Sequence, residues 1–283
     1  MQGVNLLDKL GTCPGNSRWN TRFKSYAFAD DLSEDLRNAF CNAEDLLCNA
    51  ELIKNSRSTT AGIFVVAGTR YFIKRSNVYT FVERLRRVGR LPRALRNMFI
   101  ARELKKISVK TPEVLMALST RPHGLPGASY LITEYLPDPM NLAEQLPEMI
   151  THYNSQKRLF LEVCRMVVKM HRAGIEHGDL KMVNILALAD DDSGYELGVF
   201  DLDGSRKFSA PCSEHVCCRE VARLASSFYL TMQSMDHEKL YDCRIIADEW
   251  LQAYREAGGR DLGSQRYYYQ KMEKFLHKKI FDR

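Results

Sequence analysis

The sequence lacks the features that mark several special classes of protein. Its eight cysteines include no Cys-x-x-Cys pair, and the close group Cys212, Cys217 and Cys218 lacks the paired spacing of a zinc site. We therefore expect reduced thiols, as in a cytoplasmic protein. There is also no internal repeat and no low-complexity tract, which argues against solenoid and fibrous architectures.

The chain shows no segment typical of secreted or membrane-spanning proteins. The first residues, Met1–Asn5, have neither the basic nor the apolar region of a secretory signal. Apolar runs such as Ile63–Val66 are far too short to cross a bilayer. We expect a cytoplasmic protein that meets a membrane, if at all, only peripherally.

Composition indicates an ordinary globular protein with one strongly basic segment. The 283 residues are 45% hydrophobic and 27% charged, enough for one large domain or two modest ones. The net charge of +6 is mild, but residues 70–110 hold 13 Lys or Arg against two acids, Glu83 and Glu103. Such a local excess favours an anionic partner: a nucleotide, a phosphorylated glycan, a membrane surface or a nucleic acid.

Short apolar runs dominate the first half of the chain and predict strands. These runs are Gly62–Val66, Tyr71–Lys74, Val114–Ser119 and Tyr130–Glu134. The first two flank Ala67-Gly68-Thr69, which predicts a β-hairpin with a glycine-containing turn. Helical spacing appears in residues 31–48, where we expect one helix, and in a basic segment that begins near Pro92.

Helical periodicity dominates the second half. Pro137 and Pro139 interrupt the pattern and mark the best candidate for a hinge or domain boundary. Residues 157–172 then carry an apolar stripe formed by Leu159, Phe160, Val163, Met166, Val167 and Met170. Two further short strands, Ile185–Ala189 and Tyr195–Phe200, precede a mainly helical remainder. Strands first and helices later predict an α+β fold with two lobes.

One stretch carries chemistry. Asp179, Lys181 and Asn184 follow a predicted helix at Asp-x-Lys-x-x-Asn spacing, and Asp201 ends a later strand. Phosphoryl transfer needs an oriented acceptor hydroxyl, compensated phosphate charge and held metal ions. Asp179 can accept the proton, Lys181 can meet the γ-phosphate, and Asn184 with Asp201 can ligate Mg²⁺. Alternatively, these polar residues could cap a turn or end a strand.

These residues resemble the protein-kinase superfamily. His177–Asn184 is similar to its catalytic loop, Asp201-Leu202-Asp203 to its metal-binding element with Asp in place of Gly, and Tyr71–Lys74 to the strand that carries its ATP lysine. The resemblance implies a two-lobed fold, with a five-stranded N-lobe and a helical C-lobe, that uses ATP and Mg²⁺.

The same resemblance implies further cofactor-binding residues. Lys74 would contact ATP and pair with a helical glutamate, for which Glu103 is the first candidate and Glu83 the alternative. A solvated face of a strand or helix would equally explain these residues. Adenine is expected near residues 133–136, which nominates Glu134 and Leu136.

The sequence also departs from the superfamily. No Gly-x-Gly-x-x-Gly loop precedes Lys74, and in its place stands the polar stretch 55–62, where Arg57 could cover phosphates. Gly178 replaces the arginine of His-Arg-Asp, and no Ala-Pro-Glu follows Gly204. We therefore expect no activation-loop switch.

Within the superfamily, the combined motifs are similar to the bacterial lipopolysaccharide core kinases, the Kdo and heptose kinase group. Lys110–Leu115 and Arg219–Leu224 also resemble segments of that group, so the likeness covers roughly residues 50–230. It implies transfer of phosphate to a sugar hydroxyl, heptose or Kdo, of the anionic lipopolysaccharide inner core at the cytoplasmic face. The basic segment agrees independently with such an anionic glycolipid.

Alternatives remain open at this point. A small-molecule or protein kinase would keep the same catalytic residues, and a catalytically silent kinase-fold protein would bind or scaffold without turnover. Nucleic acid is not expected, because the basic segment lacks the interleaved aromatic residues of single-strand binders. The predicted division is an N-terminal extension over 1–49, an N-lobe over 50–136 and a C-lobe over 137–283.

Overall fold

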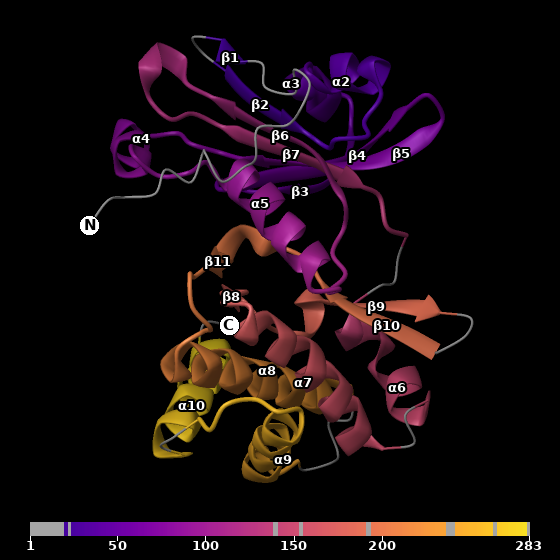
Figure 1. Cartoon of the computed structure of the whole chain (residues 1–283), viewed down its shortest axis with the longest axis vertical. Coiled ribbons are helices and arrows are strands. Elements are labelled where there is room, and N and C mark those ends of the chain that lie inside the picture. Colours follow the sequence, from indigo (N-terminus) through magenta and orange to yellow (C-terminus); the bar gives the residue numbers. More distant parts are fainter. Residues whose placement is uncertain are drawn as a thin grey trace. The chain divides into compact units, whose positions relative to one another are not determined.

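The structure, a computed structural model, describes residues 20–21, 24–137, 141–152, 155–190, 194–235, 241–262 and 265–281 (Figure 1). Pro139 of the predicted hinge lies outside these ranges. The chain divides into two compact units. Unit 1 contains the described residues up to Arg102 together with Pro112–Leu136, and unit 2 contains Glu103–Thr111 and the described residues from Pro137 onward.

Unit 1 is built on an antiparallel sheet. Its described strands lie in the order β1-β2-β6-β7-β5-β4-β3. Their bounds are Asn20–Thr21 (β1), Lys24–Phe28 (β2), Glu51–Asn55 (β3), Thr59–Val66 (β4), Thr69–Ser76 (β5), Val114–Thr120 (β6) and Ser129–Glu134 (β7). Residues 50–136 contribute β3–β7, which confirms the five strands predicted for the N-lobe, and the described sheet gains β1 and β2 from the preceding residues. The strand β2 pairs with β6, Lys24 opposite Thr120, far away in sequence, and local patterns do not reveal such a pairing.

The predicted hairpin is confirmed by β4 and β5. These strands are joined by Ala67 and Gly68, whose φ angles are +49° and +78°. Positive φ at both central residues matches the twist of a two-residue hairpin, which explains the glycine. The strands at 114–119 and 130–134 are likewise confirmed as β6 and β7.

The helices α2 (Glu34–Phe40) and α3 (Ala43–Cys48) replace the single helix predicted over residues 31–48. The break falls at Cys41 and Asn42, where Asn42 leaves helical geometry. Phe40 is fully buried and packs edge-on against Phe64 and Tyr71 of the sheet. The first fifty residues therefore contribute to the hydrophobic core of unit 1.

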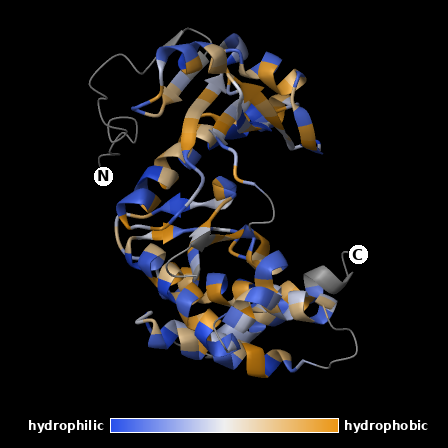
Figure 2. Cartoon of the chain, turned by 90° about the vertical axis from the view of Figure 1, so that its right-hand side faces the viewer, coloured by the Kyte–Doolittle hydropathy of each residue, from blue (hydrophilic) through white to orange (hydrophobic). Residues whose placement is uncertain are grey.

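Two more helices belong wholly or partly to unit 1. The helix α4 (Phe81–Arg87) follows β5, and α5 (Arg93–Lys106) is the basic helix predicted after Pro92. The 3₁₀ turn η1 (Pro122–Gly124) lies between β6 and β7. Figure 2 shows how hydrophobic residues concentrate along the strands of this unit.

Unit 2 is mainly helical. Its helices are α6 (Leu142–His152), α7 (Gln156–Arg172), α8 (Glu214–Met235), α9 (Cys243–Glu256) and α10 (Gln265–Phe281). The strand pairs are β8 (Ile175–Glu176) with β11 (Arg206–Lys207), and β9 (Ile185–Asp190) with β10 (Gly194–Val199). All six residues of the predicted α7 stripe are buried, which confirms that periodicity. Phe160 of this stripe packs against Phe228 and Trp250.

Two further expectations can be compared with the described residues. None of the helices in the described part of the chain has the length and apolar character needed to cross a membrane. The seven described cysteines all carry free thiols. The buried ones, such as Cys164 and Cys218, behave as small core side chains.

Candidate active site

The carboxylate of Asp179 lies among three donors of unit 2. Lys181 Nζ is 3.1 Å from Oδ2, and Arg223 Nη1 is 2.9 Å from Oδ1. Asn184 donates from Nδ2 to the backbone oxygen of Asp179 at 2.9 Å and reaches Oδ2 at 3.4 Å. About a third of the Asp179 side chain is exposed (35%). The carboxylate is therefore oriented and charge-compensated, yet accessible to an acceptor hydroxyl.

His177 organises the loop from within and is fully buried. Its Nδ1 accepts the backbone N–H of Asp179 at 3.3 Å, and its Nε2 lies 3.0 Å from the carbonyl oxygen of Phe200. Because a carbonyl can only accept, Nε2 carries the proton and the ring is neutral. His177 thus joins the catalytic loop to the segment that carries Asp201, which is a structural role.

Gly178 allows the two loops to approach closely. Its φ is +83°, and a Cβ at this position would collide with the carbonyl oxygen of Gly204. Ser205 Oγ also donates to the carbonyl of His177 at 3.0 Å. The glycine that replaces the arginine of His-Arg-Asp therefore has a local cause: no side chain fits between the loops here.

Asn184 and Asp201 lie at one end of the β9–β10 pair. The backbone N–H of Phe200 donates to the carbonyl of Asn184 at 3.1 Å. Asp201 is the next residue after this hydrogen bond. Asp201 adopts φ +58°, a left-handed conformation that Asp tolerates better than most residues.

This pair of residues suits Mg²⁺. The amide nitrogen of Asn184 faces Asp179, which leaves its amide oxygen as the atom that can ligate a cation. Mg²⁺ binds through one or two carboxylate or amide oxygens completed by water and substrate phosphates. The described residues contain no cluster of three or more His, Cys, Asp or Glu suited to a metal.

One face of α8 holds the catalytic loop, a role that the sequence did not reveal. Glu220 accepts the backbone N–H groups of His177 and Gly178 at 2.9 and 2.6 Å. Arg223 donates to the carbonyl of Gly178 at 2.9 Å, and Ser227 accepts the N–H of Met182 at 2.9 Å. These three helical residues are spaced i, i+3 and i+7, which places them on one face. The family resemblance of Arg219–Leu224, together with polar residues at this spacing, was the available signal.

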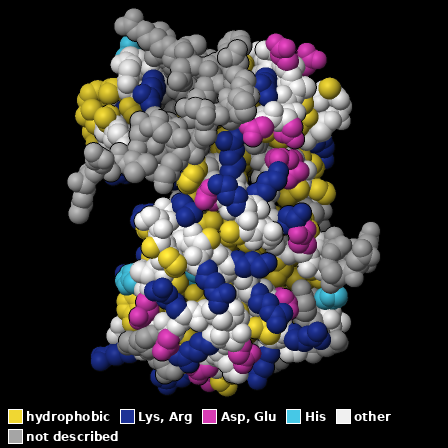
Figure 3. Space-filling view, in the orientation of Figure 1, with side chains coloured by type: hydrophobic (Ala, Val, Ile, Leu, Met, Phe, Trp, Pro, Cys, Tyr) yellow, Lys and Arg dark blue, Asp and Glu magenta, His cyan; other side chains and the backbone are white. Residues whose placement is uncertain are grey.

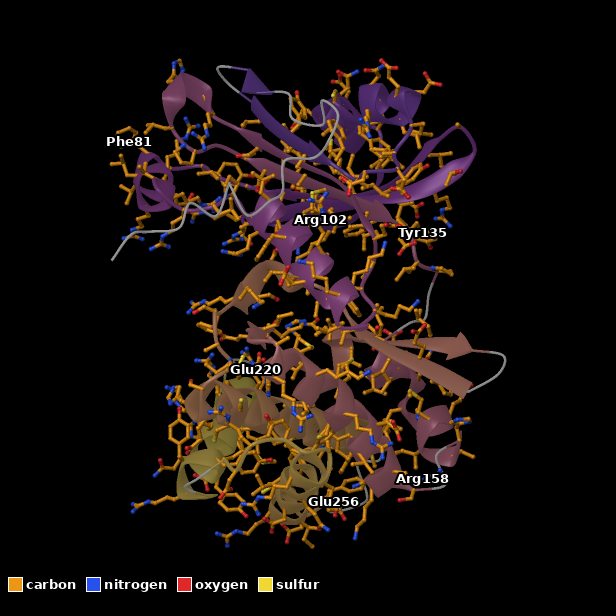
Figure 4. All side chains as sticks on the ribbon, viewed as in Figure 1. Phe81, Arg102, Tyr135, Arg158, Glu220 and Glu256 are labelled. Atoms are coloured by element: carbon orange, nitrogen blue, oxygen red, sulfur yellow. The ribbon has the colours of Figure 1, made fainter. Side chains whose placement is uncertain are left out.

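The carboxylate of Glu220 (labelled in Figure 4) is paired in the core of unit 2. His171 Nε2 lies 3.3 Å from Glu220, and His171 Nδ1 lies 2.8 Å from the hydroxyl of Tyr254. Burial alone would lower the pKa of His171, but its hydrogen bonds to Cys217 and Glu220 and the charge of Glu220 raise it to about 9. Burial would raise the pKa of Glu220, and the hydrogen bond and charge of His171 outweigh it and lower that pKa. The pair is therefore a buried ion pair beneath the loop.

The predicted cofactor residues of unit 1 lie along its sheet. Lys74 is on β5, opposite Ala61 of β4 and Leu131 of β7. Arg57 is in the turn between β3 and β4, in which Ser56 Oγ hydrogen-bonds the backbone of Thr59. The stretch thus forms a hairpin turn in place of a glycine-rich loop.

The predicted partners of ATP have local contacts of their own. Glu134, at the end of β7, accepts the N–H of Glu113 at 2.8 Å, and Leu136 follows two residues later. Glu103, which belongs to unit 2, is 2.5 Å from Lys106. The alternative Glu83 accepts the N–H groups of Tyr79 and Thr80, which lower its pKa. The structure brings Asp179, Lys181, Asn184 and Asp201 into neighbouring loops of unit 2, while Lys74, Arg57, Glu134 and Leu136 belong to unit 1.

A profile of the lipopolysaccharide kinase (Kdo/WaaP) family matches residues 49–241. The chain belongs to this family. It is therefore a phosphotransferase with a hydroxyl group as acceptor. The matched region contains every predicted site residue and also Glu220, Arg223 and Ser227 of α8.

Structural similarity supports the fold over more of the chain. A solved structure of WaaP in complex with acyl carrier protein has a TM-score of 0.59 and 22% sequence identity, and it covers 87% of this chain and 97% of that chain. No curated protein matches the sequence at a significant level. The kinase fold of this Kdo/WaaP family member, a β-rich first part and a helical second part, is thereby confirmed.

Proposed function

We propose that this lipopolysaccharide kinase transfers phosphate from ATP, with Mg²⁺, to a heptose or Kdo hydroxyl of the lipopolysaccharide inner core, and that Asp179 is its catalytic base. The observation that carries the proposal is the set of contacts around Asp179. A partly exposed carboxylate bound by Arg223, Lys181 and Asn184 has the geometry of a group that receives a hydroxyl proton.

Each residue has a separate task in this mechanism. Asp179 orients the sugar hydroxyl and accepts its proton as the oxygen attacks. Lys181 moves between the carboxylate and the transferred phosphoryl group, where it compensates negative charge. Arg223 binds Oδ1 of the carboxylate from the α8 side, while Lys181 and Asn184 contact Oδ2. When bound, Mg²⁺ would lie on Asn184 and Asp201 and would neutralise charge on the phosphates of ATP.

The nucleotide contacts of unit 1 complete the proposal. Lys74 binds the phosphates, Arg57 covers them, and Glu134 with Leu136 borders the adenine. Glu103 is the proposed ion-pair partner of Lys74, supported over Glu83 because the carboxylate of Glu83 is engaged by two backbone N–H groups. We infer further that the chain acts as a peripheral protein at the cytoplasmic face of the inner membrane, where its anionic glycolipid acceptor is made, and that nucleic acid is not a partner.

The test is phosphate transfer from labelled ATP to dephosphorylated lipopolysaccharide core, with wild type and Asp179→Ala measured side by side. We expect labelled glycan from wild type alone, with ATP affinity retained by the variant, since Asp179 is placed on the acceptor side. ATP consumption without labelled glycan would point to a kinase for another acceptor. No consumption by either protein would favour a kinase-fold binding protein.

A further inference from the structure

The helix α4 is unusual because it buries none of its residues. Most helices in proteins are stabilised by packing an apolar face, and a seven-residue helix is not stable on its own. Here the N-terminus carries a complete capping box, in which Thr80 accepts the N–H of Glu83 and Glu83 accepts the N–H of Thr80. The helix is thus maintained by its cap and not by apolar burial.

The faces of α4 are reversed relative to an ordinary surface helix. Phe81, Leu85 and Val88 share one face at i, i+4 and i+7, with 63%, 49% and 55% of their surface exposed. The opposite face carries Glu83, turned back into the cap, and Arg87. The guanidinium of Arg87 donates at 3.3 Å to the backbone carbonyl of Asn77, which follows the end of β5. Polar groups therefore face the body of unit 1 and apolar groups face outward.

Further apolar side chains enlarge this outer face. Val82 and Tyr79 are 55% and 60% exposed. Figure 3 shows hydrophobic side chains gathered on the surface over α4, and Figure 4 marks Phe81 where it extends away from the sheet. Five large apolar groups on one capped helix and its flanks form a patch that an isolated soluble protein rarely displays.

Arginines border the patch. Arg84, Arg86 and Arg90 form no ion pair within the part of the chain that the structure describes, and Arg86 and Arg90 are exposed. Other basic residues of the same segment are neutralised, for example Arg75 by Glu44 at 2.5 Å and Lys110 by Glu196 at 3.3 Å. Unpaired positive charge is therefore concentrated where the apolar side chains protrude.

We propose that α4, with its flanking residues Tyr79, Val88 and Arg90, is a docking element for an anionic lipid bilayer. The apolar side chains enter the boundary between headgroups and acyl chains, and the guanidinium groups bind headgroup phosphates. Stable peripheral binding to a membrane requires two contributions, insertion of apolar groups and attraction of positive charge to anionic headgroups. The α4 segment supplies both. Its single acid, Glu83, is kept away from the anionic surface by the capping box.

A bilayer fits this surface better than a second copy of the chain does. A stable protein interface buries about 800 Å² on each partner. Seven helical residues extend only about 10 Å, so α4 offers far less than that area. Insertion into lipid needs no shape-matched partner, because each apolar side chain contributes independently of its neighbours.

Hydrogen bonds connect α4 to the turn between β3 and β4 that contains Arg57. The buried side chain of Asn77 donates to the carbonyl of Ser56 at 3.2 Å, and the backbone carbonyl of Asn77 accepts from Arg87 of α4. Membrane contact at α4 would thus be transmitted to the turn in which Arg57 is proposed to cover phosphates. This consequence rests on the proposed function, whereas the binding itself does not.

The experiment is co-sedimentation of the full chain with vesicles of phosphatidylcholine alone or of phosphatidylcholine mixed with phosphatidylglycerol. The test variant is Phe81→Ser with Leu85→Ser, which removes no core packing and leaves the capping box intact. The matched control is Ile245→Ser, which alters an apolar side chain of α9 that is 58% exposed. Wild type and control should bind the anionic vesicles, and the double variant should bind them at least about tenfold more weakly.

Several outcomes would overturn the proposal. These are no binding of wild type to anionic vesicles, equal binding by the double variant, or equal binding to the neutral vesicles. Concentration-dependent self-association that the double variant abolishes would assign the patch to a second copy instead. A Phe81→Trp reporter provides a direct reading, since its emission should shift to the blue when anionic vesicles are added.

An assay of phosphate transfer to a soluble, deacylated core oligosaccharide tests the proposed function independently of membrane docking. The double variant should match wild type with that acceptor, because its changed residues lie outside the catalytic residues. If wild type binds vesicles but transfers no phosphate, the proposed function fails and the docking role stands. If wild type transfers phosphate but does not bind vesicles, the docking proposal fails and the proposed function stands.

Discussion

Arg223 of α8 binds the catalytic loop at two points with one nitrogen: Nη1 is 2.9 Å from the Asp179 carboxylate and 2.9 Å from the Gly178 carbonyl. The guanidinium also lies over the ring of Phe275 at 4.8 Å, so its position is fixed from α10 as well. The orientation of the proposed base is therefore set by a helix that begins about ten residues after the Asp201–Gly204 segment.

The first prediction concerns this arginine. Arg223→Gln should lower kcat about 100-fold with little change in the KM for ATP, because a small displacement of a catalytic group is enough for such a loss. Arg223→Lys should restore part of the activity, since it returns the charge without the planar fork. Steady-state kinetics with Arg165→Gln, an exposed arginine of α7, as control tests this. A rise in KM alone would contradict a positioning role.

The second prediction concerns the buried pair His171–Glu220. Glu220→Gln leaves His171 without its anionic partner, and loss of one member of a buried ion pair destabilises a protein by about 3–5 kcal/mol. Denaturant unfolding of wild type, both single variants and the double variant His171→Gln/Glu220→Gln measures the coupling. Independent, additive effects would show that the two groups do not interact.

The pH dependence of stability follows from the same pair. The pKa of His171 is raised from 6.5 to about 9. The contribution of His171 to the stability of the folded protein is therefore fully present below about pH 6.5 and is lost as the pH rises through about 9. The lowered pKa of Glu220 acts in the opposite direction: its contribution is lost as the pH falls through that value. The other groups that face His171 are Tyr254 and Cys217. The alkaline loss of stability should be smaller in His171→Gln, and an unchanged profile would refute the assignment.

The third prediction tests the metal ligand. Asp201→Ala should weaken nucleotide binding about tenfold or more in the presence of Mg²⁺ and have little effect in its absence. Calorimetric titration with ATP, with and without Mg²⁺, measures both values. Asp261→Ala changes an exposed aspartate that pairs with Arg255 and serves as control. Equal losses with and without Mg²⁺ would indicate that Asp201 acts in another way.

The fourth prediction separates two roles of glycine. Gly178 and Gly68 both have positive φ, but a Cβ at Gly178 would meet the Gly204 carbonyl, whereas at Gly68 nothing lies within 4 Å. Gly68→Ala should cost about 1–2 kcal/mol from the left-handed conformation alone. Gly178→Ala should destabilise the chain more and also reduce transfer, because the loops must separate. Equal destabilisation by the two variants would argue against the close contact.

The sequence predicted elements whose cause is local. The β4–β5 hairpin follows from two apolar runs around a glycine, and the α7 stripe follows from helical periodicity. The loop 177–184 was a candidate from its sequence because phosphoryl transfer requires fixed residue types at short spacing. The structure then placed Asp179, Lys181 and Asn184 in direct contact.

What the sequence did not reveal depends on contacts between distant segments. Glu220 and Arg223 reach residues more than forty positions earlier, and no local pattern indicates which polar residue of a helix will face a loop. The same reason explains the missed strands, since β2 finds its partner β6 only through tertiary packing. The pairing of Lys74 with Glu103 stays a prediction.

The pairing of β2 with β6 has a consequence for synthesis. Ribosomes make proteins from the N-terminus, so β2 emerges well before Thr120, the partner of Lys24, has been added. Until then Tyr26 and Phe28, which are buried in the finished protein, lack their partner strand β6. Pairings of such long range close slowly, so we expect nascent chains that end before β6 to depend on chaperones that shield these aromatic residues.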